Sequence, residues 1–200
     1  MTFLGRALRA VPSPSDAEDE EISRLVDELR AGAFDGAARA YDRWHQRVRV
    51  LARRLLGDSA SAEDVVQEVF VALPSAARRF RGGAPAFEAF VLGIAVKRAR
   101  RHQRAAARRR RACERLAGEN AHAPRTPEQD AYRRELGERL SSALAELSHD
   151  HRAAFVLCEI EGLAAAEAAL VVGAPEATVR TRLFHARRRL RELLSGEGAP

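Results

Sequence analysis

The sequence predicts an all-α protein of two small helical domains joined by a flexible linker, with a helix-turn-helix in the second domain. Alanine, leucine and arginine dominate the 200 residues, and aromatic residues make up only 6% of them, which disfavours a sheet. Apolar residues recur every three or four positions over most of the chain, as they do in amphipathic helices. Prolines and glycines gather between these stretches, where they mark turns and linkers.

The first domain is expected to span residues 21–104. Before it, the acidic run at 16–21 lies in a segment with proline and serine, so residues 1–20 are expected to form a disordered, solvated tail. A short amphipathic helix then precedes a long one that ends near Gly57, because glycine favours the left-handed conformation that follows a helix. The predicted core positions of the long helix are Phe34, Ala37, Ala38, Tyr41, Val48, Leu51, Ala52 and Leu55.

The stretch SAEDVVQEVF at residues 61–70 predicts a helix with two different sides. Ser61, with Asp64 three positions later, is typical of a helix start, and Pro74 is expected to end or bend this helix. Four apolar residues fall on one side, and four polar residues, mostly acidic, fall on another. The apolar set is Val65, Val66, Val69 and Phe70, and the polar set is Glu63, Asp64, Gln67 and Glu68.

A loop and a basic helix follow. The run RRFRGGAPAF at residues 78–87 has no helical period, and arginines around Phe80 suit an exposed cradle in which unstacked bases contact an aromatic ring. The alternative is that Phe80 and Phe87 are core anchors beside a turn. The next helix changes from apolar to strongly basic, and a basic extension and linker are expected over residues 105–133, where GENAHAPRTPEQD has linker composition.

The second domain is expected to span residues 134–195, before a short tail at 196–200. Ser148 is a candidate helix N-cap, and further on a short apolar helix is interrupted by Gly173 and Pro175 before a basic helix begins. This order is typical of a helix-turn-helix. The second helix of such a motif enters the major groove of duplex DNA, where it contacts bases and phosphates. The residues expected to do so are Thr178, Arg180, Thr181, Arg182, His185, Arg187 and Arg188.

The cations of the chain are almost all arginines. The formal net charge is +6, with 34 lysine and arginine residues, and Lys97 is the only lysine. Guanidinium groups pair with phosphate oxygens, so this excess favours phosphate-bearing partners. A genome that encodes arginine for every surface cation would give the same composition.

No enzymatic site, metal site or cofactor is expected. The two cysteines, Cys113 and Cys158, have no partner at ligand spacing, and His149 and His151 project to different sides of a helix. Phosphate-binding and nucleophile motifs are absent from the sequence. No apolar run reaches the roughly 18 residues of a membrane span, so no membrane insertion is expected, and the cysteine usage is typical of a reducing cytoplasm.

Two blocks of the sequence together resemble the extracytoplasmic-function (ECF) sigma factors, the small promoter-recognition subunits of bacterial RNA polymerase. The first block contains ARRLLGDSASAEDVVQEVFVAL and RRFRG, and the second contains ALAELSHDHRAAFVLCEIEGL and GAPEATVRTRLFHARRRLREL. The resemblance implies a sigma factor for transcription initiation. Its first domain would bind core RNA polymerase and open the proximal promoter element, and its second domain would bind the distal element.

The resemblance also implies partners and roles for individual residues. Core RNA polymerase, promoter DNA and an anti-sigma factor are the expected partners. Asp64, Gln67 and Glu68 are assigned to core polymerase, so that the acidic side of their helix binds protein and stays off DNA phosphates. Contacts with single-stranded DNA at the proximal element are expected from Arg79, Phe80, Arg81, Lys97, Arg98 and Arg101.

Other interpretations stay open on the residues alone. The chain departs from its relatives at Phe90 and Gly93, where they carry Trp and an Arg-Ile-Ala-Arg-Asn-like run, and the first helix of its helix-turn-helix is alanine-rich. The acidic side of the 61–70 helix would also suit a solvated face with carboxylates favoured by the helix dipole. The rival function is a one-component helix-turn-helix regulator that binds duplex DNA without polymerase.

Overall fold

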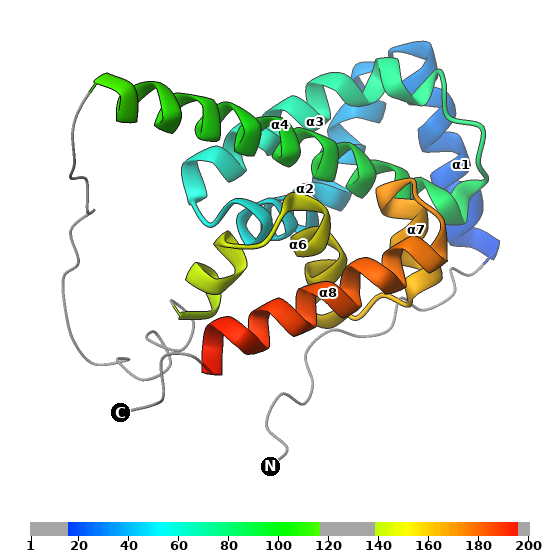
Figure 1. Cartoon of the computed structure of the whole chain (residues 1–200). Helices are drawn as coiled ribbons and strands as arrows, with labels where there is room; N and C mark the ends of the chain where they lie inside the picture. Colours follow the sequence, from blue (N-terminus) through cyan, green and yellow to red (C-terminus); the bar gives the residue numbers. More distant parts are fainter. Residues whose placement is uncertain (1–15, 117–138, 196–200) are drawn as a thin grey trace, which may run out of the picture.

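Every regular element in the described residues is a helix, which confirms the predicted fold class (Figure 1). The computed structural model describes residues 16–116 and 139–195, with side chains described outside 110–116. The first half contains α1 (Asp16–Ala31), α2 (Phe34–Leu56), α3 (Ser59–Ala77), the 3-10 helix η1 (Ala84–Ala86) and α4 (Phe87–Leu116). The second contains helical residues 139–145, α6 (His149–Phe155), the π-helix η2 (Val156–Ile160), α7 (Ala165–Val172) and α8 (Glu176–Ser195).

The acidic run at 16–21 is the start of α1. Three carboxylates lie in its first turn, where the unpaired N–H groups of a helix start favour negative charge. Glu18 also lies 3.9 Å from Arg43 on α2. The prediction that residues 1–20 form a tail is therefore wrong from Asp16 onward, because local helix electrostatics and a cross-helix ion pair both favour ordering these acids.

The helix ends of the first half follow local capping rules. α2 ends at Gly57, whose φ of 84° lies in the left-handed region that a residue without a Cβ adopts freely. The side chain of Asp58 accepts a hydrogen bond from the Ser61 N–H at 2.7 Å, so Asp58 caps α3 and the prediction for Ser61 is wrong. The helix continues through Pro74 and ends at Ala77.

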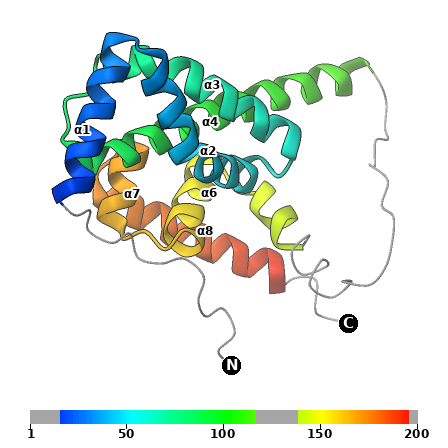
Figure 2. The same ribbon diagram turned by 180° about the vertical axis from the view of Figure 1, so that it is seen from behind.

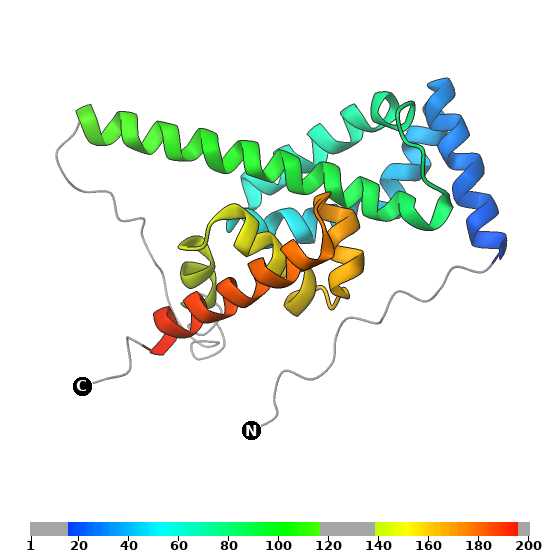
Figure 3. The same cartoon turned by 45° about the vertical axis from the view of Figure 1, so that its right-hand side comes forward.

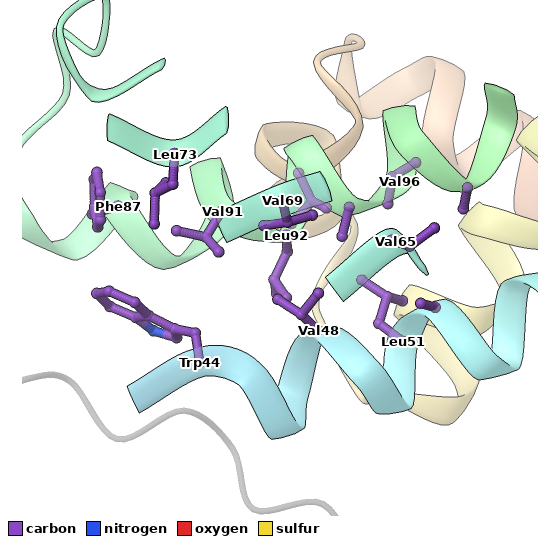
Figure 4. Packing of buried hydrophobic residues seen from close by; sticks show 14 of the residues in the cluster. Trp44, Val48, Leu51, Val65, Val69, Leu73, Phe87, Val91, Leu92 and Val96 are labelled. Atoms are coloured by element: carbon purple, nitrogen blue, oxygen red, sulfur yellow. The ribbon is translucent and has the colours of Figure 1, made fainter. Parts of the chain in front are cut away.

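A hydrophobic core fills the space between the first four long helices (Figure 4). Trp44 is 3% exposed and packs edge-on against Phe87, with ring centroids 5.4 Å apart. The prediction of a core position is wrong for three residues, since Phe34 is 84% exposed, Tyr41 is 43% exposed and Ala38 is also exposed. α2 has apolar residues on more than one side, and packing against α3 and α4 selects the stripe that contains Ala40 and Trp44.

The helix-turn-helix is confirmed in the second half. Ser148 caps α6 as predicted, because its hydroxyl accepts a hydrogen bond from the His151 N–H at 3.3 Å. Gly173 has a φ of 65° and its N–H donates to the carbonyl of Ala169 at 2.9 Å, which ends α7. α8 begins directly after Pro175, where the fixed φ of proline suits a helix start.

The two halves lie against each other. α7 packs under the first half of α4, α6 packs beside α2, and α8 runs below them (Figures 1 and 3). Seen from behind, the second half lies along one side of the helices of the first half (Figure 2). The last turns of α4 extend beyond the other helices (Figure 3). Within the described residues, no helix combines the length and the apolar character that crossing a membrane requires.

Candidate polymerase and nucleic-acid interfaces

The acidic side of α3 is partly free. Asp64 and Gln67 are exposed, and no hydrogen bond or ion pair to another described residue holds either side chain. Val65 and Val69 on the other side are 0% exposed. The two-sided helix predicted from the sequence is therefore present, and its polar side offers two unengaged side chains to a partner.

Glu68 is turned toward α4. Its Oε2 lies 3.2 Å from Nη1 of Arg98, and its Oε1 lies 2.8 Å from Nε2 of His102. Only 39% of its side chain is exposed. Glu68 thus joins α3 to α4, and the structure separates it from Asp64 and Gln67, with which the sequence grouped it.

The cations of α4 fall into two groups. Arg98 is engaged by Glu68, which distinguishes it from Lys97 and Arg101, the other two cations that the sequence assigned to single-stranded DNA. Lys97 and Arg101 are exposed, and within the described residues neither has a carboxylate partner. Since residues four apart are neighbours on one side of a helix, these two charges form a free basic pair on α4.

The ring of Phe80 is buried. It is 8% exposed and packs against Phe87 and Phe90, with ring centroids 5.1 Å and 4.8 Å away. The expectation of an exposed ring is wrong, and the core-anchor alternative describes both Phe80 and Phe87. The reason lies in the loop, which closes over the ring: a Cβ atom at Gly82 would lie 2.7 Å from Cζ of Phe80.

The loop arginines stay exposed around that buried ring. Arg81 donates from Nη1 to the carbonyl of Arg78 at 2.8 Å, and the Arg79 side chain has no hydrogen bond or ion pair among the described residues. Arg30 of α1, which the sequence did not single out, donates from Nη2 to the carbonyl of Phe80 at 2.9 Å. The loop is thus held by its backbone, which leaves Arg79 free.

One side of α8 is open to solvent. Val179, Ala186 and Leu190 are buried on the other side. Phe184 is 62% exposed and was not predicted, although its place outside the buried stripe was visible in the sequence. The exposed residues on the open side include Arg180, Thr181, Phe184, His185, Arg188 and Arg191.

Two arginines on this open side are paired within α8 itself. Arg180 lies 2.6 Å from Glu176, and Arg188 lies 3.2 Å from Glu192. Each partner is one helical turn away. Exposed pairs of this kind contribute only about 0.3–0.5 kcal/mol, so a phosphate can replace the carboxylate at small cost.

Arg182 and Arg187 form ion pairs that link α8 to α6 and η2. Nη2 of Arg182 lies 3.1 Å from Oδ2 of Asp150 on α6, and 27% of the Arg182 side chain is exposed. Arg187 pairs with Glu159 of η2, and Asp150 also lies 3.6 Å from Arg100 of α4. Arg182 thus lies at the edge of the buried side, so the placement does not support its expected base contact.

The remaining predicted residues of α8 lie near its start and middle. Thr178 is half-buried, and the exposed Thr181 donates its hydroxyl to the carbonyl of Ala177 at 3.0 Å. The ring of His185 stacks 5.8 Å from that of His151. Burial, and then the neighbouring His185, lower the pKa of His151, so His151 is neutral at pH 7.

The described residues contain no group of three histidine, cysteine or carboxylate side chains that could hold a metal ion. Cys158 is a free thiol, and burial raises its pKa, so at neutral pH it is a protonated packing residue. The side chain of Cys113 lies outside those that the structure describes.

Comparison with protein families matches both halves. Residues 40–109 match the Sigma-70 region 2 model, and residues 137–190 match the Sigma-70 region 4 model. The chain is 32% identical over 198 residues to the ECF RNA polymerase sigma factor SigD of Mycobacterium tuberculosis. That alignment covers 99% of this chain and 89% of the relative.

Solved structures with this fold include two complexes. The structure of CnrH in complex with the cytosolic domain of CnrY matches with a TM-score of 0.60 at 25% identity, and covers 92% of this chain and 100% of that one. The sigma factor RpoE of Bartonella quintana, solved with the anti-sigma factor NepR, matches with a TM-score of 0.58 at 24% identity. It covers 79% of this chain and 96% of that one.

Proposed function

Since this chain belongs to the ECF family of RNA polymerase sigma factors, we propose that three of its surfaces divide the work of promoter recognition. Sigma factors are non-catalytic subunits that bind RNA polymerase and recognise promoters. The rival function, a regulator that never contacts polymerase, would need a ligand or dimerisation domain in the first half. That half matches Sigma-70 region 2 instead.

The surface on α3 binds core polymerase. Its support is that Asp64 and Gln67 are exposed without an intramolecular partner, whereas neighbouring Glu63 lies 3.5 Å from Arg49 and Glu68 is held by α4. An unpaired carboxylate and amide beside a rigid valine core suit a basic protein surface. We therefore assign polymerase binding to Asp64 and Gln67, with Glu68 as the residue that fixes α3 against α4.

The cations of α4 and the loop contact the strand that is separated at the proximal promoter element. Lys97 and Arg101 form the free pair on α4, and Arg79 and Arg81 are exposed on the loop. A basic surface that tracks the phosphate backbone is the common feature of single-strand binding. The buried ring of Phe80 packs against Phe87 and Phe90 and fixes the loop that carries these arginines. In this proposal it does not stack on a base.

The open side of α8 reads the distal element as duplex DNA. Arg180 and Arg188 can exchange their carboxylate partners for guanine or phosphate. Phe184 adds an apolar contact of the kind that thymine methyl groups make. Its 62% exposure supports this role, because burying such a ring against DNA would remove apolar surface from water.

An anti-sigma factor is the expected regulator, and the cytoplasm, where core polymerase works, is the expected location. The Bartonella sigma factor of similar fold was solved with such a partner. A groove of about 100 Å³ between α4 and α7 suits part of one. Leu170, 66% exposed, is one of its lining residues.

The single observation that carries this division is that Asp64 and Gln67 on α3 are exposed and unpaired, and Asp64→Lys tests it. We expect this variant to lose binding to core polymerase, because a cation would then face a basic surface. Asp27→Lys on α1 is the matched control, since it changes an exposed acid by the same charge and should bind like the wild type. Binding is measured by co-elution with core enzyme, and function by run-off transcription.

Circular dichroism and thermal unfolding of both variants show whether folding is preserved. Asp64 makes no contact that stabilises α3, so the unfolding temperature should change little. Wild-type affinity of the Asp64→Lys protein for core polymerase would remove this side of α3 from the proposed interface.

A further inference from the structure

A cavity of about 290 Å³ lies between α4 and the start of α6. Its lining includes Arg100, Gln103, Arg104 and Ala107 of α4, and His149 and Asp150 of α6. Ligand sites in proteins begin at volumes of about 300 Å³, so this cavity has the size of a site for a small molecule. None of the three surfaces proposed for promoter recognition includes it.

Two arginines of this lining lie side by side. Arg100 and Arg104 are four residues apart, so they are neighbours on one side of α4. Arg104 is exposed and has no carboxylate partner among the described residues. Nη1 of Arg100 lies 3.6 Å from Oδ1 of Asp150, which is longer than a hydrogen bond. Both guanidinium groups therefore keep donors that a ligand can use.

The acidic residue of the lining does not neutralise these cations. Within the described part of the chain, Asp150 is the only acid that lines the cavity, and its Oδ2 already accepts a hydrogen bond from Nη2 of Arg182 at 3.1 Å. Arg152, which is 7% exposed, donates only to backbone carbonyls. Charges in a poorly solvated place act more strongly than charges in water. Positive charge thus exceeds negative charge around the cavity.

The ring of His149 adds an unsatisfied acceptor to the lining. Nε2 of Gln103 donates to the carbonyl of Leu55 at 2.7 Å, so Oε1 of Gln103 accepts the hydrogen bond from Nδ1 of His149 at 2.8 Å. The other ring nitrogen, Nε2, is shielded from solvent and has no hydrogen-bond partner among the described residues. Buried polar atoms without a partner are rare. A protonated phosphate oxygen that reached this nitrogen would supply the missing donor.

The pKa of His149 reflects the excess of positive charge. Burial is the main cause that lowers this pKa to about 4, and Asp150 opposes the change. Arg100, Arg152 and Arg104 also lower the pKa, because nearby cations disfavour a further positive charge. His149 is therefore neutral at pH 7, and the field that disfavours an imidazolium there favours an anion.

We propose that the cavity between α4 and α6 binds a small phosphorylated molecule, whose phosphate oxygens accept hydrogen bonds from Arg100 and Arg104. The planar fork of a guanidinium group matches the oxygens of a phosphate. Two such groups one helical turn apart can hold one phosphate or two linked phosphates. This inference goes beyond promoter recognition, and it concerns the free chain.

Pyrophosphate is the probe, because it carries two linked phosphates without a base or a sugar. Isothermal titration calorimetry of the full chain at low salt should show one saturable site. Arg104→Gln should weaken binding by about tenfold, as the loss of one charge-assisted hydrogen bond does. The matched control is Arg108→Gln, one turn further along α4, since Arg108 is exposed and lies outside the lining. It should bind within about twofold of the wild type, because exposed charges are well screened.

A second variant and a local signal test the position of the site. Ala107→Glu keeps both arginines and adds a carboxylate to the lining, so it should abolish binding, while glutamate still favours the helix. At pH 7 the ring signal of His149 in NMR, assigned with His149→Gln, should shift as pyrophosphate is added. The shift should be lost in Arg104→Gln and kept in Arg108→Gln. Thermal unfolding without pyrophosphate shows that each variant is folded.

Three results would overturn the site. The first is a wild-type chain that shows no saturable binding of pyrophosphate in the millimolar range. The second is an equal loss of binding in Arg104→Gln and Arg108→Gln, which would indicate general attraction to a basic helix. The third is a chain that uses Arg104 to bind a single-stranded oligonucleotide but does not bind pyrophosphate, since the cation would then serve a nucleic-acid backbone. Core polymerase is absent from these measurements, so they stand apart from any failure of the proposed function.

Discussion

The two basic helices, α4 and α8, carry their charge differently. On α4, Lys97 and Arg101 are exposed and have no carboxylate partner among the described residues. On α8, Arg180 and Arg188 each have an acid one turn away, at 2.6 Å and 3.2 Å. A count of arginines treats these helices alike. The structure shows that phosphate meets an open charge at Lys97 and Arg101 of α4, and must first displace a carboxylate at Arg180 and Arg188 of α8.

This difference has consequences for how each helix recognises nucleic acid. A free cation contributes the full counterion-release effect when it binds a phosphate, whatever the sequence. A paired arginine contributes less to non-specific binding, since an existing interaction is exchanged. α8 therefore depends more on groups that read bases, which suits sequence recognition, and α4 depends on charge, which suits a strand that has been separated.

The largest expected effect tests the open charges. Lys97→Ala with Arg101→Ala should weaken binding of a single-stranded oligonucleotide of random sequence roughly tenfold at 0.15 M salt, and should reduce the slope of log K against log salt by about 1.4. Fluorescence anisotropy over a salt series measures both quantities.

The matched double variant Arg180→Ala with Arg188→Ala removes the same charge from α8. On a duplex of random sequence its salt slope should fall by clearly less than the 0.9 per phosphate that an unpaired cation contributes, or about 1.8 for two. If it fell by the full amount, the intrahelical carboxylates would have no masking effect and the comparison between the helices would fail.

A smaller effect is expected from the apolar side chain of α8. Phe184→Ala should weaken holoenzyme binding to its distal element by about 1 kcal/mol, which is the order expected when one thymine methyl group loses its burial against the ring. Binding to random duplex should stay unchanged. The element is obtained by selection from a random library with wild-type holoenzyme. Leu194→Ala, 37% exposed near the end of α8, serves as control, and equal losses in the two variants would contradict base reading by Phe184.

The smallest effect comes from removing a masking acid. Glu176→Gln frees Arg180, so binding to random duplex should strengthen by a few tenths of a kcal/mol, about twofold, as expected for one exposed intrahelical pair. Glu20→Gln removes an equivalent acid, 2.5 Å from Arg24 on α1, and should have no effect. Electrophoretic mobility shifts at low salt measure both, and a Glu176→Gln protein that binds no better than the wild type would show that Arg180 is already available.

The sequence by itself determined the features that depend on a few neighbouring residues. The two-sided helix at α3 follows from period alone, and the turn between α7 and α8 follows from what Gly173 and Pro175 do to a backbone. The cap at Ser148 is equally local. The family followed from two such blocks in order. The start of α1 was missed because an acidic run suits both a tail and a helix start, and only the contact with Arg43 distinguishes them.

Tertiary structure alone decided which members of the polar sets on α3 and α4 are free. Glu68 and Arg98 look like their neighbours in sequence, and they were withdrawn from solvent because α3 and α4 bring them within 3.2 Å. Phe80 became a core residue because the loop closes over it through Gly82. The close approach of Gly93 to the carbonyl of Val171 likewise exists only where α7 meets α4. Helical period fixes the side on which a residue lies, whereas its partners lie many residues away, and only the packed chain brings them together.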